Sequence, residues 1–242
     1  DGAVLDEELY LLERADYPFE IGRWMECFIK EMMAGFSDRV AFIGLQGSRA
    51  RGEANEDSDI DAVLILERRS PEDLKTYREA LRKLPWNAKA CGFFSDLETL
   101  LCWDRADLFQ LYYDTTPYFG SLELLRPLIG SADILRAVRI GACNLCHACT
   151  HNALYGGSRT ALAGLYKAAV FVLQAERFYE TGVYLRRRSE LLPALSGRSA
   201  EILRIAELLR ENADLSEAAF ERYSALLQEW AGELIRKYAE IV

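Results

Sequence analysis

The chain has 242 residues, of which 50% are hydrophobic and 28% are charged, a composition typical of a globular protein with a buried core. Its formal net charge of -9 weighs against a large DNA or RNA partner, because non-specific nucleic-acid binding depends on neutralising phosphates. No apolar run approaches the roughly 20 residues of a membrane helix, and no secretory leader is recognisable. Six cysteines without a leader indicate free thiols, so we predict a cytoplasmic protein without membrane contact.

The first predicted elements are a helix and two strands. Apolar residues at helical spacing predict a helix over about residues 17–33, and Gly35 is expected to be its stop signal. Residues 40–45 and 60–66 are apolar runs that predict two strands. The segment between these strands is polar and acidic.

A second helix and a third strand follow. Ser70 and Pro71 precede an amphipathic pattern over residues 70–84, and Pro71 is expected at the first helical position. Residues 88–94 predict a short third strand. The segment 107–125 is left undecided between helix and strand, because Pro117 and Gly120 interrupt it.

The pattern becomes helical from about residue 132 to the end. Residues 160–182 are apolar nearly all round, which predicts a helix at the centre of a bundle. Asp214 with Glu217 three residues later predicts a capping box for the last helix. The fold class is therefore α+β: a small mixed-sheet domain over residues 1–130, followed by an all-helical C-terminal bundle over residues 131–242.

Residues 42–67, FIGLQGSRARGEANEDSDIDAVLILE, carry the chemistry. Gly47 and Ser48 follow a strand, where a turn can present backbone N–H groups and a hydroxyl to phosphate oxygens. Asp59 and Asp61 are two residues apart at the start of the next strand, so their carboxylates share one face. Such a pair can bind a hard divalent cation that also takes phosphate oxygens.

This arrangement resembles the signature of the polymerase-β-like nucleotidyltransferase superfamily. The residues that carry the resemblance are Gly47-Ser48, ten intervening residues, and Asp59-Ile60-Asp61-Ala62. The fuller form GSRARGEANEDSDID is similar to a small bacterial branch that includes aminoglycoside and lincosamide nucleotidyltransferases. The surrounding strand–motif–strand–helix order and the trailing helical bundle extend the likeness over most of the chain.

The resemblance implies a role for each matching residue. Gly47 and Ser48 would bind the β- and γ-phosphates of a nucleoside triphosphate, and Asp59 and Asp61 would hold Mg²⁺, with Mn²⁺ as the alternative. Arg51 would contact a phosphate. The competing interpretations are strand-start capping for the two aspartates and a solvated loop position for Arg51.

The chain departs from the family where a third carboxylate is expected. The family places this acid on the following strand to help bind the metal and activate the attacking hydroxyl, but residues 90–94 contain no acid. The helical domain supplies the substitute in some relatives, so we assign the catalytic role to Glu176. The alternatives are lost catalysis or one of the other candidate acids, namely Asp96, Glu98, Asp114 and Glu180.

Two further features remain open. Lys167 lies in an apolar helical segment and would contact phosphate from the helical domain, or would simply extend to solvent. The segment CNLCHACTH brings together thiols and imidazoles that could bind zinc or haem, although buried cysteines packed as small apolar residues are the simpler interpretation. Its members are Cys143, Cys146, His147, Cys149 and His151.

The predicted function is an enzyme that transfers a nucleoside monophosphate, with AMP expected, from an NTP, with ATP expected, to a hydroxyl of a small acceptor bound between the two domains. Pyrophosphate is the second product, and a homodimer is left open. One alternative is nucleotidylation of a protein or tRNA. The other is a nucleotide-binding regulator that has lost turnover together with the third acid.

Overall fold

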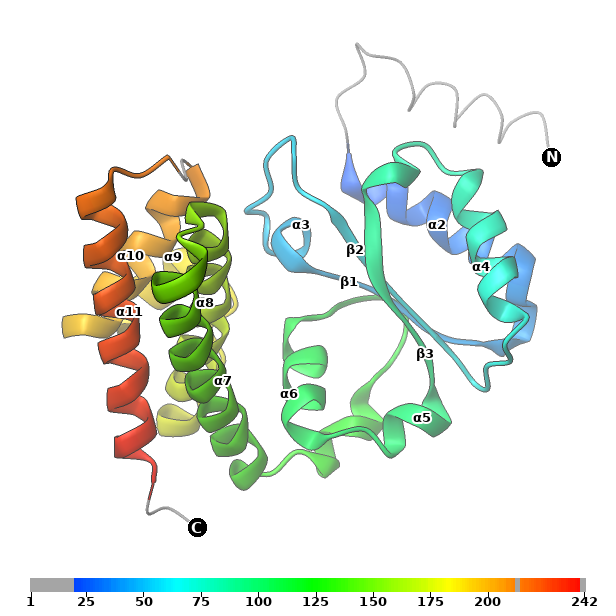
Figure 1. The fold of residues 1–242 in the computed structure, drawn as a ribbon. Helices are drawn as coiled ribbons and strands as arrows, with labels where there is room; N and C mark the ends of the chain where they lie inside the picture. The colour runs from blue at the N-terminus through cyan, green and yellow to red at the C-terminus, as the bar shows by residue number, and fades with distance from the viewer. Residues whose placement is uncertain (1–19, 212–213, 240–242) are drawn as a thin grey trace. The chain divides into compact units, whose positions relative to one another are not determined.

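The computed structural model describes residues 20–211 and 214–239, and it divides the chain into two compact units (Figure 1). The first unit comprises the chain up to Asp104 together with Asp114–Pro127, and the second comprises Arg105–Tyr113 and the chain from Leu128 onward. The predicted domain limits of 1–130 and 131–242 stay a prediction. The compact units differ from them in that residues 105–113 pack with the second unit.

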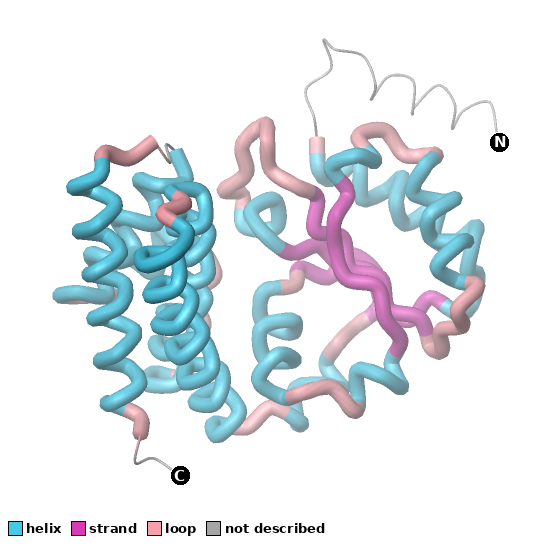
Figure 2. Tube along the Cα trace, in the orientation of Figure 1, coloured by secondary structure: helices cyan, strands magenta, loops and turns pink. Residues whose placement is uncertain are grey.

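The first unit is built on a four-stranded sheet with the order β3-β2-β1-β4 (Figure 2). β1 pairs antiparallel with both β2 and β4, whereas β2 and β3 are parallel, so the sheet is mixed as predicted. The strands are β1 Val40–Gln46, β2 Ile60–Leu66, β3 Ala90–Asp96 and β4 Thr116–Gly120.

Helices α2 (Ile21–Phe36) and α4 (Asp73–Arg82) lie side by side over one face of this sheet (Figure 1). Their core takes alternate residues of β2, which are Ile60, Ala62, Leu64 and Leu66. Because side chains alternate along a strand, Asp61 projects from the opposite face of the sheet. The core between the two helices and the sheet, called the first core below, therefore fixes the direction of the Asp61 carboxylate.

The observed ends of several elements differ from their predicted ends. α2 continues through Gly35 to Phe36, so Gly35 is not its stop signal, and the part of the predicted helix before residue 20 lies outside the described residues. α4 begins at Asp73 rather than at Pro71. The segment 107–125, which was left undecided between helix and strand, contains both: α6 (Arg105–Asp114) is a helix and β4 is a strand.

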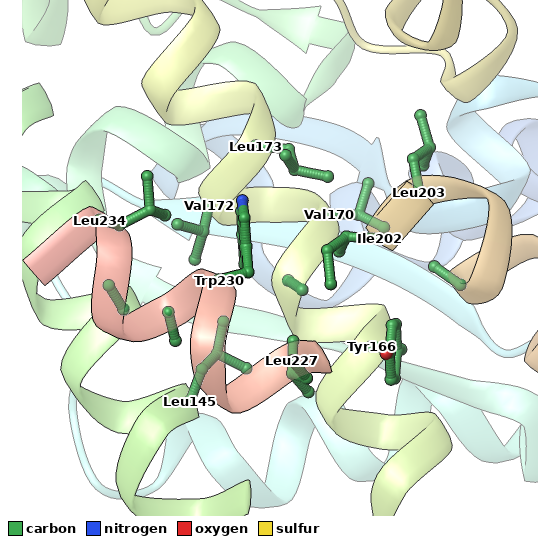
Figure 3. Close-up of a cluster of buried hydrophobic side chains, with 14 of the residues drawn as sticks. Leu145, Tyr166, Val170, Val172, Leu173, Ile202, Leu203, Leu227, Trp230 and Leu234 are labelled. Carbon is green, nitrogen blue, oxygen red and sulfur yellow. The ribbon is translucent and has the colours of Figure 1, made fainter. Parts of the chain in front are cut away.

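The described residues of the second unit form helices joined by loops, with no strand among them. α8 (Arg159–Thr181) contacts three other helices, which places it at the centre of the bundle as predicted. Figure 3 shows part of the core around it, where Val172 of α8 lies beside Trp230. The unit also contains nearly all of α6, together with α7 Ser131–His151, α9 Arg188–Leu191, α10 Gly197–Glu211 and α11 Glu217–Lys237.

The start of α11 differs from its prediction. Its N-cap is Ser216, whose hydroxyl accepts a hydrogen bond from the N–H of Ala219 at 3.3 Å. The predicted capping box at Asp214 is therefore wrong by two residues. Within the described part of the chain, no helix is long and apolar enough to span a membrane.

Candidate nucleotide-binding site

Gly47 and Asp61 are in direct contact. Gly47 ends β1 and begins the short helix α3 (Gly47–Arg51), and its φ of 73° lies in the region that favours glycine. A Cβ atom built on Gly47 would lie 1.9 Å from Oδ2 of Asp61. The Gly47-Ser48 turn and the start of β2 therefore meet at one edge of the sheet, as the phosphate and metal interpretation requires.

Asp59 and Asp61 offer carboxylate oxygens of the kind that Mg²⁺ binds. Asp59 directly precedes β2 and is exposed, whereas Asp61 is half-buried in the strand. Among the described residues, no group of three or more His, Cys, Asp or Glu side chains could hold a metal ion. A pair of carboxylates is still suitable for Mg²⁺, because this ion usually binds one or two carboxylates together with water and substrate phosphates.

Arg49 is a site residue that the sequence analysis missed. Its guanidinium donates hydrogen bonds to the main-chain carbonyls of Ser58, at 2.6 Å, and Asp59, at 3.0 Å. Burial lowers the pKa of Arg49, and the nearby charges of Asp59 and Asp61 oppose that shift. Arg49 therefore anchors the loop that carries Asp59 and places a positive charge near both aspartates.

Arg51 is paired with two carboxylates of the first unit. Its buried guanidinium donates to both carboxylate oxygens of Asp114, at 2.9 and 3.1 Å, and to Glu53 at 3.1 Å. Burial opposes its charge, but Asp114 and Glu53 outweigh this effect and raise the pKa of Arg51. Arg51 therefore ties α3 to the chain segment that enters β4, and its phosphate contact stays a prediction.

Glu176 is also engaged in structural contacts. Its buried carboxylate accepts hydrogen bonds from the Nζ of Lys237 at 2.8 Å and from the hydroxyl of Tyr238 at 3.0 Å. Glu180 binds the same lysine at 2.6 Å. These contacts favour a role for Glu176 in attaching the end of α11 to α8, and its role as a catalytic base stays a prediction.

The other candidate acids have structural partners as well. Asp96 is the N-cap of α5 (Leu97–Leu101) and accepts a hydrogen bond from the N–H of Thr99 at 2.8 Å. Glu98 pairs with Arg68 at 3.2 Å, and Asp114 pairs with Arg51. None of these contacts points to a third metal-binding carboxylate.

Cys91 occupies the position on β3 beside Asp61. The parallel register pairs these two residues, so their side chains share a face, and Cys91 is exposed. Neighbouring strands lie about 4.8 Å apart, which puts the residue at position 91 within reach of Asp61. A thiol therefore stands where a carboxylate on this strand could have completed the site.

Lys167 and the cysteine–histidine segment belong to the second unit. Lys167 is exposed on α8, and no ion pair joins it to another described residue, so its phosphate contact stays a prediction. The segment CNLCHACTH is continuous helix in α7. Cys149 is buried there, its thiol donates to the carbonyl of Ser224 at 3.2 Å, and burial raises its pKa to about 11. This environment favours a packed thiol for Cys149.

Comparison with known proteins supports the family resemblance. Residues 27–98 match a family model described as a nucleotidyltransferase domain, and this range includes β1, β2, β3 and the motif. A solved structure of spectinomycin adenyltransferase AAD(9) from Enterococcus faecialis, with ATP and spectinomycin, matches with a TM-score of 0.54. The match has 11% sequence identity and covers 88% of this chain and 98% of that chain, so it shows a shared fold.

A search of curated proteins finds no match to this sequence. The domain match and the shared fold agree with the geometry of the Gly47-Ser48 turn and Asp61. Residues 27–98 are therefore similar to a nucleotidyltransferase domain, and the chain shares the fold of the spectinomycin adenyltransferase.

Proposed function

We propose that the protein transfers AMP from ATP to a hydroxyl group of a small acceptor in a Mg²⁺-dependent reaction that releases pyrophosphate. The observation that carries the proposal is the contact between Gly47 and Asp61, because it brings a phosphate-binding turn to a metal-binding carboxylate. The structural neighbour with ATP and spectinomycin supports ATP as donor and a small molecule as acceptor. The acidic net charge of -9 favours such an acceptor over a polynucleotide.

The first unit supplies the groups for donor binding. The N–H groups of the turn and the hydroxyl of Ser48 are suited to phosphate oxygens, and Asp59 and Asp61 would hold the Mg²⁺. The bound ion would neutralise charge on the triphosphate. Arg49 positions the main chain at Asp59 through its hydrogen bonds to the carbonyls of Ser58 and Asp59. Catalysis would then depend mainly on alignment and charge stabilisation.

The acceptor hydroxyl must lose its proton during transfer. Cys91, rather than a carboxylate, lies beside Asp61 on the neighbouring strand. This observation favours a second candidate function, a nucleotide-binding regulator with little or no turnover. The two functions differ in pyrophosphate release but share the nucleotide site.

Thermal unfolding with ATP, GTP, CTP and UTP, each with and without Mg²⁺, tests the site. We expect Mg²⁺-ATP at about 100 times its dissociation constant to stabilise the wild type by about 2.7 kcal/mol. The double variant Asp59→Asn/Asp61→Asn should lose this response. Asp57→Asn is the matched control, because it removes an exposed carboxylate of the same loop. A wild type that responds to no nucleotide would contradict the proposal.

Pyrophosphate release in the presence of hydroxylated compounds separates the two functions. Release that depends on acceptor, Mg²⁺ and both aspartates supports the transferase. Nucleotide binding without release across a broad acceptor set supports the regulator. In that case, Cys91→Asp should introduce measurable release if the missing carboxylate is the cause.

A further inference from the structure

The second unit has a pocket of its own between α6, α7 and α8, and the same helices can be followed in Figure 1. Its cavity volume is about 340 Å³. This value is at the lower end of the roughly 300–1,000 Å³ typical of small-molecule sites. All of its described lining residues belong to the second unit, so the pocket exists independently of the nucleotide site.

Close packing of α7 against α8 forms one wall of this pocket. Gly141 of α7 lies against Val172 of α8, where an added Cβ would come within 2.5 Å of the valine Cγ2. Both residues line the pocket, as do the small side chains of Ala168 and Ala175. Small residues along both helices therefore leave an apolar space beside a tightly packed helix pair.

Aromatic rings form another part of the lining. Phe109 and Tyr184 meet edge to face with ring centroids 5.7 Å apart, and Phe171 lines the same pocket. Phe109 also stacks on Phe178 at 5.5 Å, which supports its ring from the far side. Aromatic faces attract flat apolar groups and cations. This lining therefore suits an apolar ring body and a positively charged group.

Few polar side chains line the pocket, and the charge among them is negative. Among the described lining residues, Asp107 is charged, while Gln110 and Asn144 offer neutral hydrogen-bonding groups. No lysine or arginine is among those residues, so the lining does not suit a triphosphate. One carboxylate in a lining that also includes aromatic rings favours a ligand with a single cationic group.

We propose that this pocket binds a small molecule with an apolar ring body and one positively charged amine. Shape and apolar lining select the body, whereas Asp107 and the aromatic rings select the amine. Binding requires neither nucleotide nor turnover, so this inference goes beyond the proposed transferase and does not depend on it.

Three probes with the same phenylbutyl body test the proposal: 4-phenylbutylamine, 4-phenylbutan-1-ol and 5-phenylpentanoate. Their dissociation constants are measured by NMR titration of the full chain. We expect the amine to bind about 2–5-fold more tightly than the alcohol, as a cation near aromatic faces and a partly exposed carboxylate should. The carboxylate probe should bind most weakly of the three.

Two variants locate the binding. Ala168→Phe places a large ring in the pocket from an exposed helix position and should abolish binding of all three probes. Ala161→Phe is the matched control, because Ala161 is an exposed alanine of the same helix and does not line the pocket. Asp107→Asn should remove the preference for the amine and retain binding of the alcohol. Thermal unfolding confirms that each variant is folded.

Three results would overturn the proposal. The first is the absence of binding by every probe. The second is binding of 5-phenylpentanoate as tightly as the amine, since this would show that the head group is not selected by charge. The third is equal binding by Ala168→Phe and Ala161→Phe, which would place the probes outside this pocket.

Discussion

Gly47 combines two constraints that no other residue type satisfies. Its φ of 73° is strained for a side chain, and its Cβ position overlaps the Asp61 carboxylate. We expect Gly47→Ala to lower the free energy of unfolding by about 1–3 kcal/mol and to abolish stabilisation by Mg²⁺-ATP. Thermal unfolding with and without Mg²⁺-ATP measures both effects.

Gly52→Ala is the matched control for this prediction. Gly52 has a nearly identical φ of 71°, but nothing lies within 4 Å of an added Cβ. This variant should share the backbone strain and keep the nucleotide response. If Gly47→Ala responds to Mg²⁺-ATP as Gly52→Ala does, the contact with Asp61 is not important for binding.

Cys91 provides a chemical probe of the same site. Cys91 and Cys102 are both exposed in the first unit, whereas the buried Cys149 has a pKa raised to about 11 and should react slowly with thiol reagents. We expect Mg²⁺-ATP to slow alkylation of Cys91 by iodoacetamide and to leave Cys102 unchanged, as measured by mass spectrometry of the peptides. Equal protection of the two thiols would argue against nucleotide binding beside Asp61.

The different partners of the two motif arginines could not be predicted from the sequence. Arg49 and Arg51 are two positions apart in the motif, and nothing local distinguishes them. The distinction comes from Asp114, which is 63 residues away in the chain and binds Arg51. Local spacing could predict Gly47 and the aspartates, because their function depends on neighbours in the motif itself. It could not predict a partner brought in by the tertiary fold.

At the scale of elements, an ion pair joins the start of β1 to the start of α4. Both terminal nitrogens of Arg39 donate to the Asp73 carboxylate, at 2.8 and 2.9 Å, and the N–H of Ser70 donates to it at 2.7 Å. The hydrogen bonds from Arg39, opposed by burial, hold the pKa of Asp73 below its usual value. The folded state therefore favours the charged carboxylate.

This ion pair predicts a pH dependence of stability. A carboxylate with a lowered pKa stabilises the folded state above its unfolded value, near pH 3.9, and the contribution disappears as the pH falls through the folded value. Because Arg39 is 43% exposed, we expect a modest contribution, about 0.5–1 kcal/mol. Urea unfolding should show Asp73→Asn less stable than wild type at pH 7, with the difference reduced at pH 3. An equal difference at both pH values would contradict this.

Packing also explains which elements could be predicted. The apolar run of β2 is continuous, and its predicted limits of 60–66 agree with the structure. α2 passes Gly35 because Phe36 is 2% exposed and packs in the first core, which holds the last turn of the helix. The segment that forms α6 and β4 was undecided because Pro117 and Gly120 interrupt its pattern. For α2 and for the segment of α6 and β4, tertiary contacts rather than the local pattern determine the structure.

At the scale of the whole molecule, the site and the ion-pair cluster of Glu176 belong to different compact units. Gly47, Arg49 and the two aspartates lie in the first unit. Glu176 lies in the second and is 7% exposed. Burial opposes the charge of Lys237, but the hydrogen bonds that Lys237 donates to Glu176 and Glu180 outweigh this effect and raise its pKa. This cluster has the features of a structural anchor for the end of α11.

Glu176→Gln tests this assignment. The amide can still accept a hydrogen bond from Tyr238 but loses its charge attraction to Lys237, so we expect the free energy of unfolding to fall by about 1–3 kcal/mol. Stabilisation by Mg²⁺-ATP and the rate of any pyrophosphate release should stay within about twofold of wild type, because a structural anchor makes no contact with the reacting groups. Urea unfolding, nucleotide melts and a pyrophosphate assay measure the three quantities.

Glu180→Gln separates the anchor from the alternative. The side chain of Glu180 is 40% exposed, and Lys237 would keep its bond to Glu176, so this variant should cost less stability than Glu176→Gln. General-base catalysis typically contributes about 10²–10⁴-fold. If Glu176→Gln lowers the rate of pyrophosphate release by such a factor and leaves the free energy of unfolding unchanged, Glu176 acts as the base. A loss of stability with the rate preserved would instead leave deprotonation of the acceptor to groups around Asp59 and Asp61.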